Sequence, residues 1–117
     1  MPLQMLRTTI LLLFLMTTSC TNNPTVEFLG FDGCPNTPVL RERLVTALPH
    51  MNIVDVDLMA LQEGDPRLGW GAPTILVAGK DLFHTLPGGK HVSCRAWADG
   101  LPTADEIRNA FESENDE

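Results

Sequence analysis

The stretch VEFLGFDGCPNT, residues 26–37, decides the fold predicted for this chain. It joins a short apolar run, typical of a central strand buried on both faces, to a cysteine placed where a helix is expected to begin. Farther along, GAPT at residues 71–74 opens a second apolar run with a proline. A helix N-terminus favours the thiolate form of a cysteine through its free amides and the positive end of its dipole. The first stretch therefore indicates a site centred on Cys34.

The apolar spacing in the rest of the chain predicts the element order β-α-β-α-β-β-α. The expected elements are a strand at 25–31, a helix at 39–48, a strand at 52–58, a short helix at 59–68, hairpin strands at 74–78 and 82–85, and a helix that starts at 101–103. Thr103 and Glu106 have the spacing of a capping box at the start of that last helix. The order predicts an α/β domain with a central mixed sheet of about four strands flanked by helices.

The first helix has two possible starts, because Pro35 and Pro38 both suit a first helical position. If Cys34 caps the helix, Pro35 takes that position. If Thr37 caps it, Pro38 comes first and Cys34 lies just outside the strongest part of the dipole. The second start would weaken stabilisation of the thiolate.

The first nineteen residues have the pattern of a secretory signal. Arg7 precedes the apolar stretch 10–16, which is shorter than the roughly 20 residues needed to cross a bilayer. Small residues before Cys20 resemble a bacterial lipobox, with Thr17 where leucine is usual. The resemblance implies removal of residues 1–19, lipidation of Cys20, and a membrane anchor in the bacterial cell envelope with the domain facing the periplasm or the exterior. The alternative is an ordinary signal peptide that is cleaved nearby.

This processing predicts a short linker at 20–24, one domain at 25–112 and an acidic tail at 113–117. Without the leader the chain keeps seven basic against fifteen acidic residues, a formal charge of −8. A nucleic-acid partner is therefore not expected. We expect a monomer without a cofactor. In an exported protein, the two thiols that remain, Cys34 and Cys94, lie in a compartment where disulfides persist.

The expected topology brings those two thiols together. The order of elements resembles that of the thioredoxin fold, in which a proline before a later strand, here Pro73, faces the cysteine. The resemblance implies that the strand after Pro73 runs antiparallel to the first, so that its start lies beside Cys34, and that the next hairpin strand returns toward the same end. The loop at 86–93 then emerges near Cys34 and delivers Cys94 to it.

FDGCPN at 31–36, GAPT at 71–74 and SCR at 93–95 together resemble small bacterial thioredoxin-like proteins, some of which are encoded near organomercurial lyases. The resemblance spans roughly 26–111. It implies a thioredoxin-like fold whose principal residue is Cys34. It departs from the thioredoxin motif at Thr37, where that motif has its second cysteine, so dithiol chemistry within the motif is impossible.

The favoured hypothesis is thiol–disulfide exchange with protein thiols or disulfides, in which Cys34 attacks and Cys94 resolves the mixed disulfide. Thr37 would hydrogen-bond the thiolate, Pro73 would position an extended partner segment, and Trp70 would form an apolar wall. The alternative for Thr37 is simple helix capping, and the alternative for Trp70 is ordinary packing in the core. One alternative is a non-catalytic binding domain stapled by a Cys34–Cys94 disulfide. Another is capture of a soft metal such as mercury or copper(I) by the two thiolates, with His91 as a possible third ligand.

Overall fold

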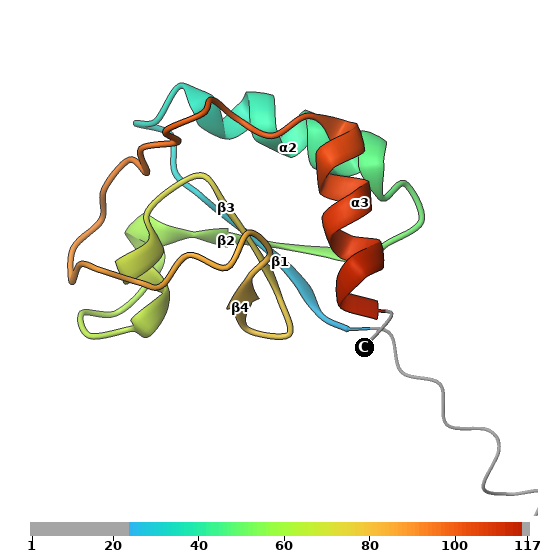
Figure 1. The fold of residues 1–117 in the computed structure, drawn as a ribbon. Helices are drawn as coiled ribbons and strands as arrows, with labels where there is room; N and C mark the ends of the chain where they lie inside the picture. The colour runs from blue at the N-terminus through green and yellow to red at the C-terminus, as the bar shows by residue number, and fades with distance from the viewer. Residues whose placement is uncertain (1–23, 116–117) are drawn as a thin grey trace, which may run out of the picture.

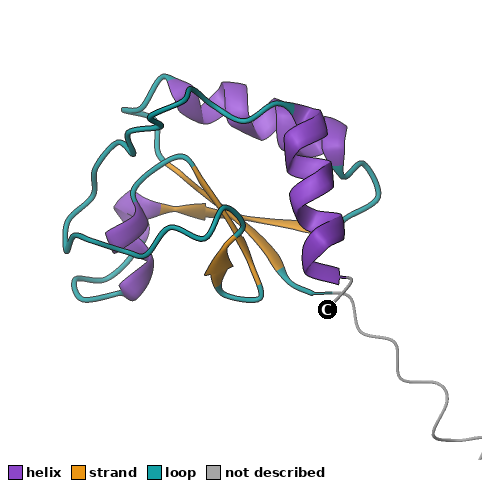
Figure 2. Ribbon diagram, viewed as in Figure 1, coloured by secondary structure: helices purple, strands orange, loops and turns teal. Residues whose placement is uncertain are grey.

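The computed structural model describes residues 24–115, which form a four-stranded mixed sheet with two helices (Figures 1 and 2). The strand order is β2-β1-β3-β4. The central β1 (Val26–Gly30) pairs in parallel with β2 (Ile53–Asp57) and antiparallel with β3 (Thr74–Val77). The short β4 (Lys80–Asp81) pairs antiparallel with β3. The predicted α/β class and mixed sheet are confirmed.

Helices α2 (Asn36–Ala47) and α3 (Ala104–Asn115) lie on one face of this sheet, as Figure 1 shows. Their apolar residues meet alternate residues of the central strands, because successive side chains of a strand point to opposite faces. This core contains Phe28, Leu40, Leu44, Ile75, Ile107 and Phe111. The remaining side chains of β1 and β3 face a second, smaller cluster on the other side of the sheet, which includes Leu29, Leu58, Leu68, Ala72 and Leu76.

The segment that covers this second face is not the helix predicted at 59–68, so the predicted element order is wrong at this point. Two short 3-10 helices stand there, η1 (Leu58–Ala60) and η2 (Pro66–Trp70). An aspartate caps each of them by accepting an amide N–H two residues on, Asp57 for η1 and Asp65 for η2. Between them Gly64 has a φ of 91°, which a continuous right-handed helix does not allow.

The predicted hairpin is also shorter than expected. Its turn falls at Ala78 and Gly79, which have φ values of 52° and 82°. The second strand ends at Asp81, and of the stretch predicted as a strand at 82–85 only the Leu82 amide still bonds β3, at the carbonyl of Ile75. The reason is local: the Asp81 carboxylate accepts the amides of Phe83 and Thr85, and His84 has a φ of 65°. These contacts turn the backbone away from the sheet.

The start of α2 differs from its prediction, and the start of α3 agrees with it. Helix α2 begins at Asn36 with Pro35 as its N-cap and no side-chain cap, so it matches neither predicted start. Helix α3 has the predicted capping box: Thr103 Oγ1 accepts the Glu106 amide and the Glu106 carboxylate accepts the Thr103 amide. The helix continues through residue 115, into the stretch predicted as a tail at 113–117.

The signal peptide, Cys20 and all of the linker except Pro24 lie outside the described residues. Within residues 24–115, no helix is both long and apolar enough to cross a membrane.

Candidate functional site

Cys34 lies at the carboxyl end of β1, one residue before the N-cap of α2. Its side chain is only 3% exposed. Its Sγ donates a hydrogen bond of 3.3 Å to the carbonyl oxygen of Ala72, the residue before Pro73. The peptide bond between Ala72 and Pro73 is cis. The expected juxtaposition of Cys34 and the proline loop is therefore present.

The backbone of Ala72 is already paired with another segment of the chain. Its amide donates to the carbonyl of Ser93 (2.9 Å), and its carbonyl accepts the amide of Arg95 (2.7 Å). This is a parallel bridge in which Cys94 lies opposite Ala72. The edge at which Pro73 was expected to position an extended partner is therefore occupied by residues 93–95.

The bridge places Cys94 next to Cys34, as the expected topology requires. Both cysteines are free thiols, Cys34 buried and Cys94 exposed. The pKa of the Cys94 thiol is raised, first by a hydrogen bond with Cys34, then by partial desolvation, and then by repulsion from negative charge on Cys34. The two side chains therefore lie near each other.

Thr37 does not make the predicted contact. Its Oγ1 is buried and has no hydrogen-bond partner among the residues that the structure describes. The side chain packs instead toward Gly30, where an added Cβ would come within 2.6 Å of Thr37 Cγ2. The amide of Thr37 donates to the carbonyl of Cys34, not to its sulfur. Thr37 thus packs the start of α2 against the end of β1.

An ion pair that the sequence did not reveal fixes the segment that carries Cys94. The Arg95 guanidinium lies 2.9 Å from the Asp81 carboxylate, and the exposed fractions of the two side chains are 9% and 0%. Arg95 also donates to the hydroxyls of Thr74 (3.1 Å) and Thr85 (3.0 Å). Its guanidinium carbon lies 3.8 Å from the centre of the Trp97 ring. Arg95 therefore ties the residue after Cys94 to β3 and β4.

In the sequence, Asp81 falls between the two predicted hairpin strands, and Arg95 is part of the SCR stretch at 93–95. A buried charge needs a partner, but the sequence separation between these two residues leaves no periodic signal. Asp81 stands four residues before Thr85, and its carboxylate accepts the Thr85 amide. This short spacing is the one local indication in the sequence that the loop is ordered.

Cys94 opens onto a pocket of about 600 Å³. Three aromatic residues line it, Trp70, Phe83 and Trp97, with the backbone of Gly88 and Gly89. Trp70 Nε1 donates to the carbonyl of Thr85, and Trp97 Nε1 donates to that of Pro73, so both indoles are held in place. This agrees with the expectation that Trp70 forms an apolar wall. We call this space the Cys94 pocket.

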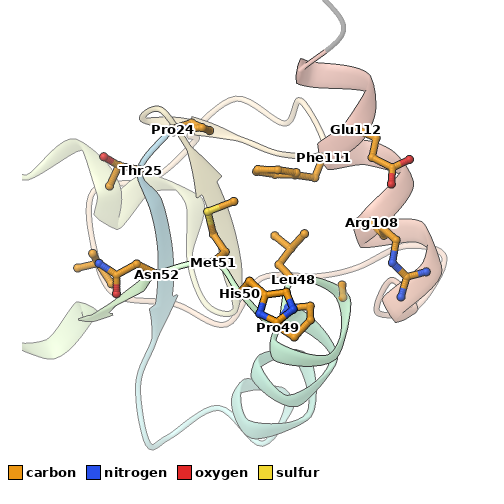
Figure 3. Close-up of a pocket in the computed structure, with 12 residues that line it drawn as sticks. Pro24, Thr25, Leu48, Pro49, His50, Met51, Asn52, Arg108, Phe111 and Glu112 are labelled. Carbon is orange, nitrogen blue, oxygen red and sulfur yellow. The ribbon is translucent and has the colours of Figure 1, made fainter. Parts of the chain in front are cut away.

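A second pocket, of about 770 Å³, lies at the other end of β1 (Figure 3). Leu48, Met51 and Phe111 point into it, and His50, Arg108 and Glu112 stand around it. It contains neither cysteine, since it is formed by the start of β1, the end of α2 and the last turns of α3.

His91 does not join the two thiols. It is exposed and lines a separate depression with Met59 and Glu63. Among residues 24–115, no three side chains of His, Cys, Asp or Glu are grouped as they would be to hold a metal ion.

Comparison of this chain with models of protein families, with curated proteins and with solved structures finds no match.

Proposed function

We propose that this chain is an exported, lipid-anchored protein with a thioredoxin-like fold that carries out thiol–disulfide exchange at Cys34 and Cys94. The observation that carries the proposal is the placement of two free thiols beside the same residue, Ala72: Cys34 is hydrogen-bonded to its carbonyl, and Cys94 lies opposite it in the bridge. The order of strands around β1, with the cysteine between β1 and α2, supports the fold assignment. Protein thiols and disulfides are the proposed partners.

The exchange needs two thiols and no further group. One thiolate of the pair attacks a sulfur of a disulfide, R–S–S–R′, so that a mixed disulfide forms and R′S⁻ leaves. The second thiolate attacks the cysteine sulfur of that mixed disulfide, which releases RS⁻ and leaves a Cys34–Cys94 disulfide. Two electrons pass from the pair to the substrate, and the two cysteine protons end on the released thiols.

Access to the two sulfurs differs. The order expected from the sequence, with Cys34 attacking first, requires a local opening of the structure, because Cys34 is buried and hydrogen-bonded to Ala72. Cys94 is reached directly from solvent. The pairing of thiols is the same in either order.

The test is the reduction potential of the pair in the full chain, measured by mass-tagging free thiols across a graded dithiothreitol series. A reversible Cys34–Cys94 disulfide with a potential near or above about −270 mV supports exchange, because thioredoxin-like catalysts lie in that range. A bridge that resists reduction below about −300 mV indicates a structural staple instead. Two thiols that never pair would leave metal or partner binding as the better hypothesis.

The single variants Cys34→Ser and Cys94→Ser are the matched controls, since in each the number of tagged thiols should no longer change across the dithiothreitol series. Cys20 contributes either no tag, if it carries a lipid, or one constant tag, so the same spectra report its state.

A further inference from the structure

We propose that the Cys94 pocket is the substrate site of this exchange, that Cys94 is the thiol that meets the substrate, and that the site selects cationic or neutral disulfides over anionic ones. The inference rests on the proposed function, because it assumes that the Cys34–Cys94 pair exchanges with a disulfide. Three features of the site support it: the thiol that lines the pocket, the backbone edge that is already occupied, and the charges around the pocket.

The first observation concerns access. Cys94 lines the pocket, whereas Cys34 is buried behind it and does not. A disulfide that enters between Trp70 and Trp97 therefore meets Cys94 first. The pocket volume of about 600 Å³ lies within the roughly 300–1,000 Å³ of small-molecule sites.

The second observation limits the kind of substrate. An extended peptide would need the free backbone groups of Ala72, and these are bonded to Ser93 and Arg95. The substrate is consequently a small disulfide, or a disulfide that protrudes from its own protein into the pocket. It does not add as a strand at Ala72.

The third observation is the charge of the lining. Asp99 and Glu106 line the pocket, and within residues 24–115 the one basic residue that lines it is Arg95. Arg95 is neutralised by Asp81 and lies against Trp97, so it is not free to bind an anion. Two other basic residues do not line this pocket. Lys90 lines the separate depression that contains His91. Arg43 donates hydrogen bonds to the backbone carbonyls of Leu101 and Pro102.

The reaction then proceeds in a fixed order. Cys94 loses its proton to solvent, and its thiolate attacks one sulfur of R–S–S–R, so that the S–S bond breaks and RS⁻ leaves. Cys34 then loses its proton, and its thiolate attacks Cys94 Sγ to form the Cys34–Cys94 disulfide and release the second RS⁻. The two RS⁻ groups take up from solvent the two protons that the cysteines lost. Because the pKa of Cys94 is raised, the first step accelerates as pH rises above neutrality.

The test measures the rate at which the reduced full chain is oxidised by three symmetric disulfides: cystamine (cationic), bis(2-hydroxyethyl) disulfide (neutral) and dithiodiglycolate (anionic). Each rate is divided by the rate of free dithiothreitol with the same probe, which removes differences in leaving-group reactivity. We expect the normalised rate with cystamine to exceed that with dithiodiglycolate by about ten-fold at low ionic strength. The ratio should fall toward one at about 1 M salt, where the Debye length is about 3 Å.

Two variants assign the preference to the pocket. Asp99→Asn and Glu106→Gln should each lower the ratio by about three-fold, and glutamine at 106 retains the capping box. Glu112→Gln, beside the other pocket, changes net charge equally and should leave the ratio unchanged. In addition, Cys34→Ser should accumulate a mixed disulfide at Cys94, while Cys94→Ser should not react at Cys34 in the folded protein.

The outcomes separate the two proposals. Formation of the Cys34–Cys94 disulfide at equal normalised rates with all three probes, or equal effects of Glu112→Gln and Asp99→Asn, overturns the charge selection and leaves the exchange intact. Rapid labelling of Cys34 in Cys94→Ser overturns the order of attack. No Cys34–Cys94 disulfide with any probe overturns the proposed function itself.

Discussion

Replacing Arg95 by methionine tests whether the Arg95–Asp81 pair holds the segment that carries Cys94. Methionine keeps an unbranched apolar stem against Trp97 but removes the charge that faces Asp81. The Asp81 side chain is fully buried, with an exposed fraction of 0%. The variant therefore leaves a buried carboxylate without its cation.

The expected loss of unfolding free energy depends on the hydrogen bonds that Asp81 keeps in the variant. Removal of one member of a buried ion pair typically costs about 3–5 kcal/mol. Asp81 keeps two amide donors, from Phe83 at 3.2 Å and from Thr85 at 2.9 Å, which places the cost at the lower end. We expect the free energy of unfolding to fall by about 3 kcal/mol, equivalent to a fall in Tm of roughly 12–24 °C for a domain of this size.

The assay is urea unfolding followed by far-UV circular dichroism, with Asp81→Asn and the double variant completing a thermodynamic cycle. We expect the double variant to be more stable than the sum of the single effects by about 2 kcal/mol, because it no longer contains an unpaired buried charge. A loss below about 1 kcal/mol for Arg95→Met, or strictly additive effects, would refute the reasoning. Alkylation of Cys94 in native protein should also be faster in Arg95→Met, since the neighbouring backbone is less constrained.

Gly71→Ala should cost about 1–3 kcal/mol of unfolding free energy and speed alkylation of Cys94, because Gly71 has a φ of 75° and a Cβ would lie 2.9 Å from the Ser93 carbonyl oxygen; unchanged urea midpoints would contradict this. Thr37→Val should be neutral or stabilising by up to about 1 kcal/mol, because its buried Oγ1 has no partner within residues 24–115; a clear loss of stability in the same assay would show that the hydroxyl is used. Arg67 lowers the pKa of the Asp65 carboxyl from 3.8 to about 2, first through side-chain hydrogen bonds. The contribution of this pair to the free energy of unfolding is therefore complete above about pH 4 and is lost as pH falls toward about 2. Acid titration of urea midpoints should therefore be flatter over that range in Asp65→Asn, and identical slopes would contradict the assignment.

Much of the fold could be predicted from residues close together in the sequence. The buried strand at β1, the helix after Cys34 and the capping box of Thr103 and Glu106 each depend on a spacing of a few residues. The errors also have local causes. The helix predicted at 59–68 was wrong because aspartate caps and a glycine with positive φ favour two short 3-10 turns. The strand predicted at 82–85 was wrong because the Asp81 side chain bonds the amides that a ladder would need.

The candidate site could be predicted only in part. The proximity of Cys34 and Cys94 followed from strand directions, and the structure agrees with it. Their roles as exchanging thiols stay predictions. The hydrogen bond expected from Thr37 is missing: its methyl group packs toward Gly30, and its buried hydroxyl has no partner within residues 24–115.

By itself, the sequence determined the α/β class and the placement of a cysteine between β1 and α2, because apolar periodicity, turns and caps act within a few residues. Only the tertiary structure decided that Cys34 is buried, that residues 93–95 occupy the edge at Ala72, and that Arg95 pairs with Asp81. The physical reason is that burial and ion pairing depend on which distant segments exclude water from the same space. That selection is made when the chain packs, and no local pattern carries it.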